Sequence, residues 1–147
     1  MAAKEVKPKL KIYGYHQFYK DGKLLYCEKY GLSGKPDFIF KRHNKYIPVE
    51  LKSGKLKGAG KPRLGDLMQL VAYFFIIHSE FGKMPRQGRL IYGDTMFIVK
   101  NRRRLRKQFL GILSEMKSVL EYGCEFDDVE QSFSKCKYCI CRETVCE

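Results

Sequence analysis

Two segments on either side of His43-Asn44 constrain the fold of this chain most, because they predict a β-hairpin with one register. Asn tolerates the positive φ that a two-residue hairpin loop requires, so we centre the loop on this pair. The expected cross-strand pairs are Lys41–Tyr46, Ile39–Pro48, Asp37–Glu50, Phe38–Val49 and Phe40–Ile47. Apolar and polar positions then alternate, which predicts one core face and one polar face. Because proline removes a ladder hydrogen bond, Pro48 indicates an edge strand or a bulge that would shift this register by one residue.

The same register brings two carboxylates, Asp37 and Glu50, together on the polar face. Opposite β-carbons lie about 5 Å apart, where like charges destabilise a hairpin unless something neutralises them. A divalent cation would do so, and hard oxygen ligands select Mg²⁺ or Mn²⁺. Lys52 projects from the same face and could orient a water or stabilise charge on an attacked phosphate. The alternative is an ordinary exposed polar face.

A helix is predicted from Leu64 to His78, where apolar residues recur at helical spacing. Its expected core positions are Leu67, Met68, Val71, Phe74 and Phe75. Asp66, Gln69 and Tyr73 fall on another stripe, because spacings of three and four residues align side chains on a helix. The amide and the phenol suit contacts with phosphate and base, although both residue types are also ordinary on the flank of a helix.

Three blocks together resemble the RecB-like PD-(D/E)xK nucleases in order and rough spacing. They are Gly34-Lys35-Pro36-Asp37, Glu50-Leu51-Lys52 and Gln69-Leu70-Val71-Ala72-Tyr73. The resemblance implies that Asp37, Glu50 and the main-chain carbonyl of Leu51 hold one or two Mg²⁺ or Mn²⁺ ions. It also implies that Lys52 positions or deprotonates the attacking water, and that Gln69 and Tyr73 hold DNA.

Four of the six cysteines lie near the end of the chain: Cys136, Cys139, Cys141 and Cys146. With no signal peptide at the start, we expect a cytoplasmic protein, in which structural disulfides are rare. A Cys-x-x-Cys pair with further cysteines suits a tetrahedral zinc site. It also suits an iron–sulfur cluster, and spacing alone does not separate the two.

These cysteines resemble the terminal triplet of the CRISPR-associated RecB-like exonucleases. In that family three C-terminal cysteines and one distant cysteine hold an iron–sulfur cluster, which implies Cys136, Cys139 and Cys146 as ligands here. Cys27 is the candidate for the fourth ligand, although it lies only ten residues before Asp37. Cys124 and Cys141 are the alternatives. The cluster is expected to tie the C-terminal tail to the domain.

The same nucleases carry a metal-binding histidine on a helix well before the aspartate. His16 is the only histidine upstream of Asp37, so it is the candidate for this ligand. Its neighbours read more like a strand than a helix, and a surface or core histidine is the alternative. A minimal, virus-borne member or a gene start placed too late would explain the missing helix.

Basic residues dominate the charge, with 29 Lys and Arg against 16 Asp and Glu and a net charge of +13. That balance indicates a polyanionic partner, and nucleic acid above others. The glycine-rich stretch 54–63 is expected to be a phosphate-contacting loop. Its basic residues are Lys55, Lys57, Lys61 and Arg63.

A second basic cluster, Arg102, Arg103 and Arg104, opens a predicted helix. The helix carries a stripe of apolar residues at Leu105, Phe109, Ile112, Met116 and Val119. Its basic face could follow a DNA strand or could be an ordinary solvated face. Before it, residues 89–92 and 96–99 are predicted strands around a Gly93-Asp94 turn that extend the sheet.

We therefore expect a single domain over residues 1–147, α/β and restriction-endonuclease-like, with a mixed central sheet flanked by helices and a cysteine-rich lid at 124–147. No stretch is long enough to span a membrane. The resemblance implies an exonuclease on DNA ends, mostly single-stranded, that trims DNA for CRISPR spacer acquisition beside the integrase complex. The alternatives are a phage or viral nuclease of recombination or replication, and a catalytically inactive iron–sulfur DNA-binding module.

Overall fold

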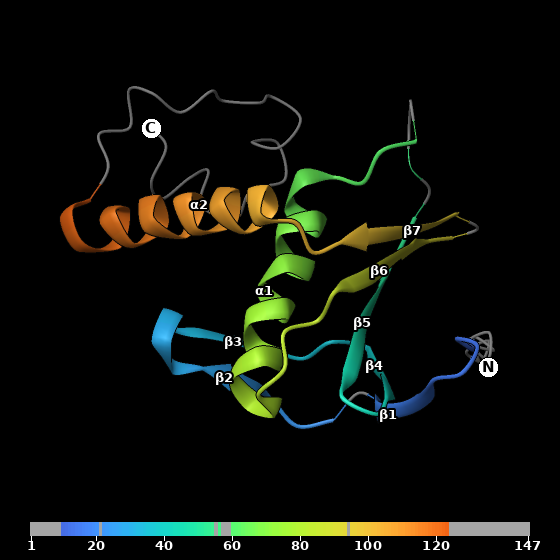
Figure 1. The fold of residues 1–147 in the computed structure, drawn as a ribbon. Helices are drawn as coiled ribbons and strands as arrows, with labels where there is room; N and C mark the ends of the chain where they lie inside the picture. Colours follow the sequence, from blue (N-terminus) through green and yellow to red (C-terminus); the bar gives the residue numbers. More distant parts are fainter. Residues whose placement is uncertain (1–9, 21, 55, 57–59, 94, 124–147) are drawn as a thin grey trace, which may run out of the picture. The chain divides into compact units, whose positions relative to one another are not determined.

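A mixed five-stranded sheet and two helices form the framework of the described chain (Figure 1). The computed structural model describes residues 10–20, 22–54, 56, 60–93 and 95–123. The strands are β1 (His16–Lys20), β2 (Leu25–Cys27), β3 (Leu32–Gly34), β4 (Phe38–Arg42), β5 (Lys45–Lys52), β6 (Gln87–Tyr92) and β7 (Thr95–Lys100). The helices are α1 (Leu64–Phe81), α2 (Arg103–Tyr122) and a short 3₁₀ turn, η1 (Glu28–Tyr30).

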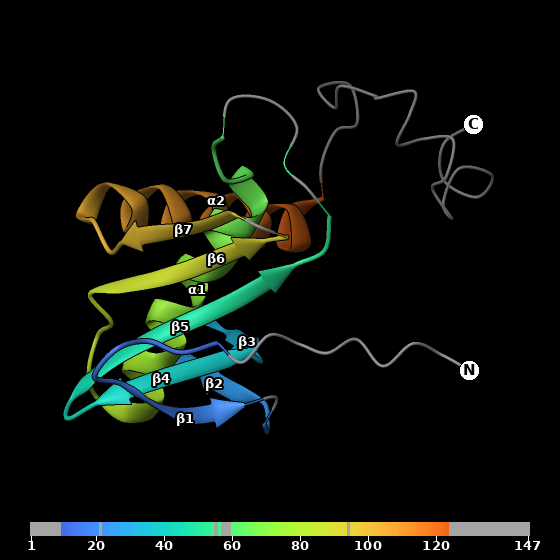
Figure 2. The same cartoon turned by 90° about the vertical axis from the view of Figure 1, so that its right-hand side faces the viewer.

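The strand order in the sheet is β1-β4-β5-β6-β7, which Figure 2 shows from one edge to the other. All neighbours are antiparallel except β5 and β6, which run parallel. A parallel pair needs a long crossover, and α1 supplies it. In Figure 1, α1 lies between this sheet and a second sheet made of β2 and β3.

The register of the β4–β5 hairpin is the one that the sequence predicts. Phe38 pairs with Val49, Ile39 with Pro48 and Lys41 with Tyr46. The turn differs in one respect, because the residue with positive φ is His43, at 50°, and not Asn44. The ladder pairs with β6 begin only at Val49, so Pro48 belongs to no ladder pair on that side. This explains how an inner strand tolerates the proline without a bulge.

The expectation of one polar face on this hairpin is wrong. Ile39 and Pro48 are fully buried on the supposed polar face, because α1 covers it. The opposite face forms a core of Ile12, Phe38, Phe40, Ile47 and Val49, with Leu10 and Tyr15 packed against it. Buried on both faces, the hairpin therefore belongs to the centre of the fold.

Helix α1 is longer and more deeply buried than its sequence pattern predicts. It continues to Phe81 and ends at Gly82, whose φ of 73° suits a glycine cap. Leu70, Ile76 and Ile77 are buried in addition to Met68, Val71, Phe74 and Phe75, whereas Leu67 of the expected stripe is only partly buried. Because sheets lie on two sides of the helix, an apolar stripe on one side is not enough, and nearly its whole circumference is buried.

The strands and helix after α1 follow the prediction. β6 starts two residues before its expected range, and β7 extends one residue beyond its expected range at each end. The chain divides into two compact units, Met1–Ile112 and Leu113–Glu147. Helix α2 begins in the first unit and ends in the second. Within the first unit, Phe109 of α2 is buried and stacks on Phe75 of α1, with ring centroids 5.5 Å apart. Among the described residues, neither helix is apolar enough over a sufficient length to cross a lipid bilayer.

Candidate active site

Acidic, basic and amide side chains meet where the parallel strand β5 ends against α1. Glu50 and Lys52 lie two residues apart on β5, so both point to the face that α1 covers. Asp37 lies directly before β4, one residue beyond the last ladder pair. Helix α1 adds Asp66, Gln69 and Tyr73, because its first turns pass over the end of β5. All of these residues belong to the first unit of the chain.

Asp37 is held by the main chain of the opposite strand. Its Oδ2 accepts a hydrogen bond from the Leu51 N–H at 2.7 Å. The carboxylate therefore has a fixed orientation at the open end of the hairpin, next to Glu50 as the register predicts. The negative charge of Asp37 raises the pKa of Glu50.

Glu50 is the one buried acidic residue of the described chain, with 7% of its surface exposed. Its Oε1 accepts a hydrogen bond from Gln69 Nε2 at 2.9 Å and lies 3.4 Å from Lys52 Nζ. Its Oε2 is buried without a hydrogen-bond partner among the described residues. Burial raises the pKa of Glu50, the nearby charge of Asp37 raises it further, and Lys52 acts in the opposite direction. A buried carboxylate with one unpaired oxygen needs a cation or a proton.

Lys52 lies between the strand and the helix. Its Nζ forms ion pairs with Glu50 at 3.4 Å and with Asp66 Oδ1 at 3.5 Å, and it donates a hydrogen bond to Gln69 Oε1. The ammonium group is therefore fixed by three acceptors, with 19% of its side chain still exposed. A cation fixed in this way can act on a ligand at the end of β5 without first losing conformational freedom.

The orientation of the Gln69 amide follows from its neighbours. Its Nε2 donates to Glu50 and also to the Tyr73 hydroxyl at 2.8 Å. Tyr73 in turn donates to the Lys35 carbonyl at 3.2 Å. Burial raises the pKa of Tyr73, so the phenol stays protonated and can donate. The chain of donors holds the Gln69 carbonyl toward Lys52.

Two participants, Asp66 and Tyr92, are absent from the sequence-based site. Asp66 Oδ2 accepts a hydrogen bond from the Tyr92 hydroxyl at 2.6 Å. Burial raises the pKa of Tyr92, and its hydrogen bond to Asp66 raises it further. The position of Asp66, one turn before Gln69 on the same stripe, was a usable signal. No sequence signal pointed to Tyr92, because only the parallel register of β5 and β6 places it beside Lys52 in the site.

The other predicted ligands of this site and of the cluster are placed as follows. His16 is exposed on β1 and pairs with Lys41, so it lies about 13 Å along β4 from the end at Asp37 and does not join the site. Cys27 is a free thiol, buried at the end of β2. Cys124, Cys136, Cys139, Cys141 and Cys146 lie outside the described residues. Within the described part, no group of three His, Cys, Asp or Glu side chains could hold a metal by itself.

The predicted DNA-contacting residues are largely exposed. Lys61, Arg63, Arg102, Arg103 and Arg104 reach solvent, whereas Lys55 and Lys57 lie outside the described residues. Arg102 and Arg104 line a cavity of about 590 Å³ between β7 and the first turns of the two helices, together with Lys100 and the apolar Leu67 and Phe97. Basic groups thus gather over an apolar floor close to the start of α1.

Comparisons with known proteins bear on the fold alone. No protein-family model and no curated protein matches the sequence. The crystal structure of SSO0001 is similar, with a TM-score of 0.50 and 18% sequence identity over 88% of this chain and 56% of that chain. The chain therefore spans little more than half the length of that structure. The likeness supports the α/β fold described above.

Proposed function

We propose that this protein is a metal-dependent deoxyribonuclease with a restriction-endonuclease-like, RecB-type PD-(D/E)xK core. The observation that carries the proposal is the buried Glu50 carboxylate beside Asp37. One of its oxygens has no hydrogen-bond partner among the described residues, and a fixed lysine follows two residues later. A carboxylate with a raised pKa in such a cluster is typical of functional sites. In a purely structural role, the unpaired oxygen would destabilise the fold, because its desolvation would not be compensated by a hydrogen bond.

The donor set fits Mg²⁺ or Mn²⁺. Asp37, Glu50 and the Leu51 carbonyl would hold the ion, and all three donors are hard oxygens. Only two acidic side chains contribute, so water and substrate phosphate would complete the shell, as is common for Mg²⁺. When bound, the metal would neutralise the charge on the attacked phosphate and lower the pKa of a coordinated water.

The residues of the chain would position the reactants. Lys52, fixed by Glu50, Asp66 and Gln69, would hold the attacking water or stabilise negative charge on the phosphate. Gln69 would hold Glu50 and Lys52 in place, because its amide already donates to Glu50 and Tyr73 and accepts from Lys52. Tyr73 would keep this amide oriented. Either side chain would contact DNA through an oxygen lone pair that these bonds leave over. Lys61, Arg63 and the cluster Arg102–Arg104 would bind the phosphate backbone.

We propose single-stranded DNA ends as the substrate and exonucleolytic trimming as the reaction, with the CRISPR integrase complex as partner. A viral nuclease of recombination or replication is the alternative with the same chemistry. The net charge of +13 supports a nucleic-acid substrate for both. The C-terminal cysteines Cys136, Cys139 and Cys146 would hold an iron–sulfur cluster, with Cys27, Cys124 or Cys141 as fourth ligand and zinc as the alternative metal.

The test of the reaction is digestion of end-labelled single-stranded DNA with Mn²⁺, Mg²⁺ or EDTA. We expect metal-dependent digestion that Glu50→Gln and Lys52→Ala each reduce by about 100-fold or more. Lys23→Ala is the matched control, because Lys23 is exposed and its side chain is not among those that form the candidate active site. Labels at either end give the polarity.

A second candidate function is a DNA-binding module without activity, and the position of His16 away from the site favours it. Binding of DNA by the wild type without digestion under either metal would support this module over the nuclease. The cluster is tested separately by absorbance and metal analysis of anaerobically purified protein. A brown colour that Cys139→Ser removes supports iron–sulfur, and a colourless protein containing zinc overturns it.

A further inference from the structure

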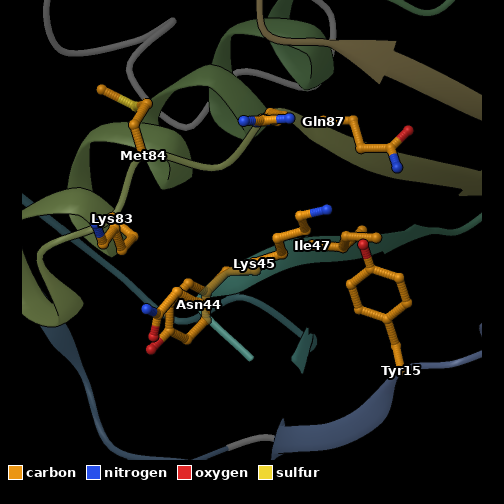
Figure 3. Close-up of a pocket in the computed structure, with 9 residues that line it drawn as sticks. Tyr15, Asn44, Lys45, Ile47, Lys83, Met84 and Gln87 are labelled. Atoms are coloured by element: carbon orange, nitrogen blue, oxygen red, sulfur yellow. The ribbon is translucent and has the colours of Figure 1, made fainter. Parts of the chain in front are cut away.

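A second cavity lies at the other end of β5 from the carboxylates (Figure 3). Its volume is about 480 Å³, and it is bounded by the β4–β5 turn, the loop after α1 and the start of β6. Lys45 lies seven residues before Lys52 on the same strand, a distance of roughly 20 Å or more. Side chains alternate along a strand, so Lys45 also belongs to the face opposite to Glu50 and Lys52. The cavity is thus separate from the candidate active site.

Every charged residue that lines this cavity is basic. Lys45, Lys83 and Arg86 come from three segments of the chain, and no Asp or Glu of the described residues lines the cavity. In the described part of the chain, both ion pairs belong to Lys52, so none of these three side chains is in an ion pair. None of them forms a side-chain hydrogen bond there either. All three side chains are exposed to solvent, and their charges give the hollow a positive potential that attracts an anion.

The uncharged lining residues suit a phosphate ester better than a simple inorganic anion. Asn44 and Gln87 bring amide groups, and Tyr15 brings a hydroxyl group. In Figure 3 the Lys45 side chain lies between Gln87 and Tyr15, whose hydroxyl end points into the same space. Ile47 and Met84 add apolar wall. The volume falls in the range of small-ligand pockets, large enough for a sugar and a base beside the phosphate.

We propose that this cavity binds the phosphate group of a nucleotide, with Lys45 and Arg86 as its cationic ligands. The nucleotide is a free mononucleotide or a unit of a nucleic-acid strand, since both present the same phosphate. The site is independent of the nuclease proposal, because none of its residues belongs to the network around Glu50. It gives the protein a second anchor for nucleotides at the opposite end of β5 from Glu50.

The experiment is isothermal titration in EDTA, where metal-dependent digestion cannot consume the probe. The probes are inorganic phosphate, dAMP and a 5′-phosphorylated oligothymidylate. We expect saturable binding that Lys45→Gln and Arg86→Gln each weaken by about tenfold or more, the loss typical of one charge-assisted hydrogen bond. Lys23→Gln, a charge-matched change at an exposed position outside the cavity, should leave the affinity unchanged.

The probes also separate the two sources. Binding of dAMP that depends on Lys45 identifies a free nucleotide, whereas dependence seen with the oligonucleotide alone identifies a strand. The proposal is overturned if no probe binds, or if both variants bind as the wild type does. Glu50→Gln should bind dAMP normally, so loss of digestion with intact dAMP binding separates the two sites.

Discussion

Gln69 Nε2 donates a hydrogen bond to Glu50 Oε1 at 2.9 Å, and through it α1 fixes the carboxylate at the end of β5. The same amide accepts a hydrogen bond from Lys52 on its other side. One side chain of the helix therefore holds the Glu50 carboxylate and the Lys52 ammonium group of the strand in place relative to each other. The three residues act as a unit, and we expect changes in them to be non-additive.

Substitution of Gln69 tests this relationship. Gln69→Ala removes a donor to Glu50 and an acceptor for Lys52, which should cost about 1–3 kcal/mol of stability through unsatisfied buried groups. We also expect digestion to fall by about tenfold or more, because Lys52 loses its fixed position. Thermal unfolding and digestion rates measure the two effects. Gln17→Ala, on the exposed face of β1, is the control and should change neither.

The raised pKa of Glu50 makes stability depend on pH. The folded state binds the proton of Glu50 more tightly than the unfolded state, whose value is about 4.5. Without divalent metal, stability should therefore fall as the pH rises from 4.5 through the raised folded pKa, and level off above it. Glu50→Gln should remove this part of the pH dependence and be more stable than the wild type at neutral pH. Urea unfolding across pH in EDTA measures it, and parallel curves for both proteins would contradict it.

The hairpin and its register could be predicted because local rules determine them. A two-residue turn and alternating apolar residues are properties of neighbouring positions, and Asp37 and Glu50 follow from them. Burial of Ile39 and Pro48 could not be read in the same way, because α1 covers that face from a distant part of the sequence. The positive φ of the turn lies at His43, whereas residue preference alone favours Asn44 for it.

The same division applies to the site. Gln69 and Tyr73 were expected from their spacing on one helix, whereas Tyr92 enters only through the parallel pairing of Lys52 with β6. Parallel pairing across a helical crossover leaves no local trace in the sequence. His16 was considered for its residue type, and the β1 register sets it beside Lys41, away from the carboxylates.

Divalent metal should stabilise the protein in a pH-dependent way. A cation bound by Asp37 and Glu50 competes with the proton on Glu50, so the gain should be larger at pH 8 than at pH 5. At a metal concentration of about 100 times the Kd, the gain is about 2.7 kcal/mol. Thermal unfolding with and without Mn²⁺ measures it. Glu50→Gln should lose the gain, while an equal gain in that variant would locate the metal elsewhere.

Two glycines should respond to alanine with opposite signs. Gly88 lies on β6 under α1, where an added Cβ would stand 2.9 Å from Leu70 Cδ1 and 3.0 Å from Phe74 Cε1. Both side chains are fully buried and cannot move aside, so Gly88→Ala should cost about 1–3 kcal/mol. Gly111 lies inside α2, and no neighbouring atom of the described residues lies within 4 Å of an added Cβ. Gly111→Ala should therefore stabilise the protein by about 0.5–1 kcal/mol, because alanine loses less backbone entropy in a helix. Urea unfolding of both variants measures the difference, and a neutral Gly88→Ala would mean that α1 does not pack against β6 as closely as this.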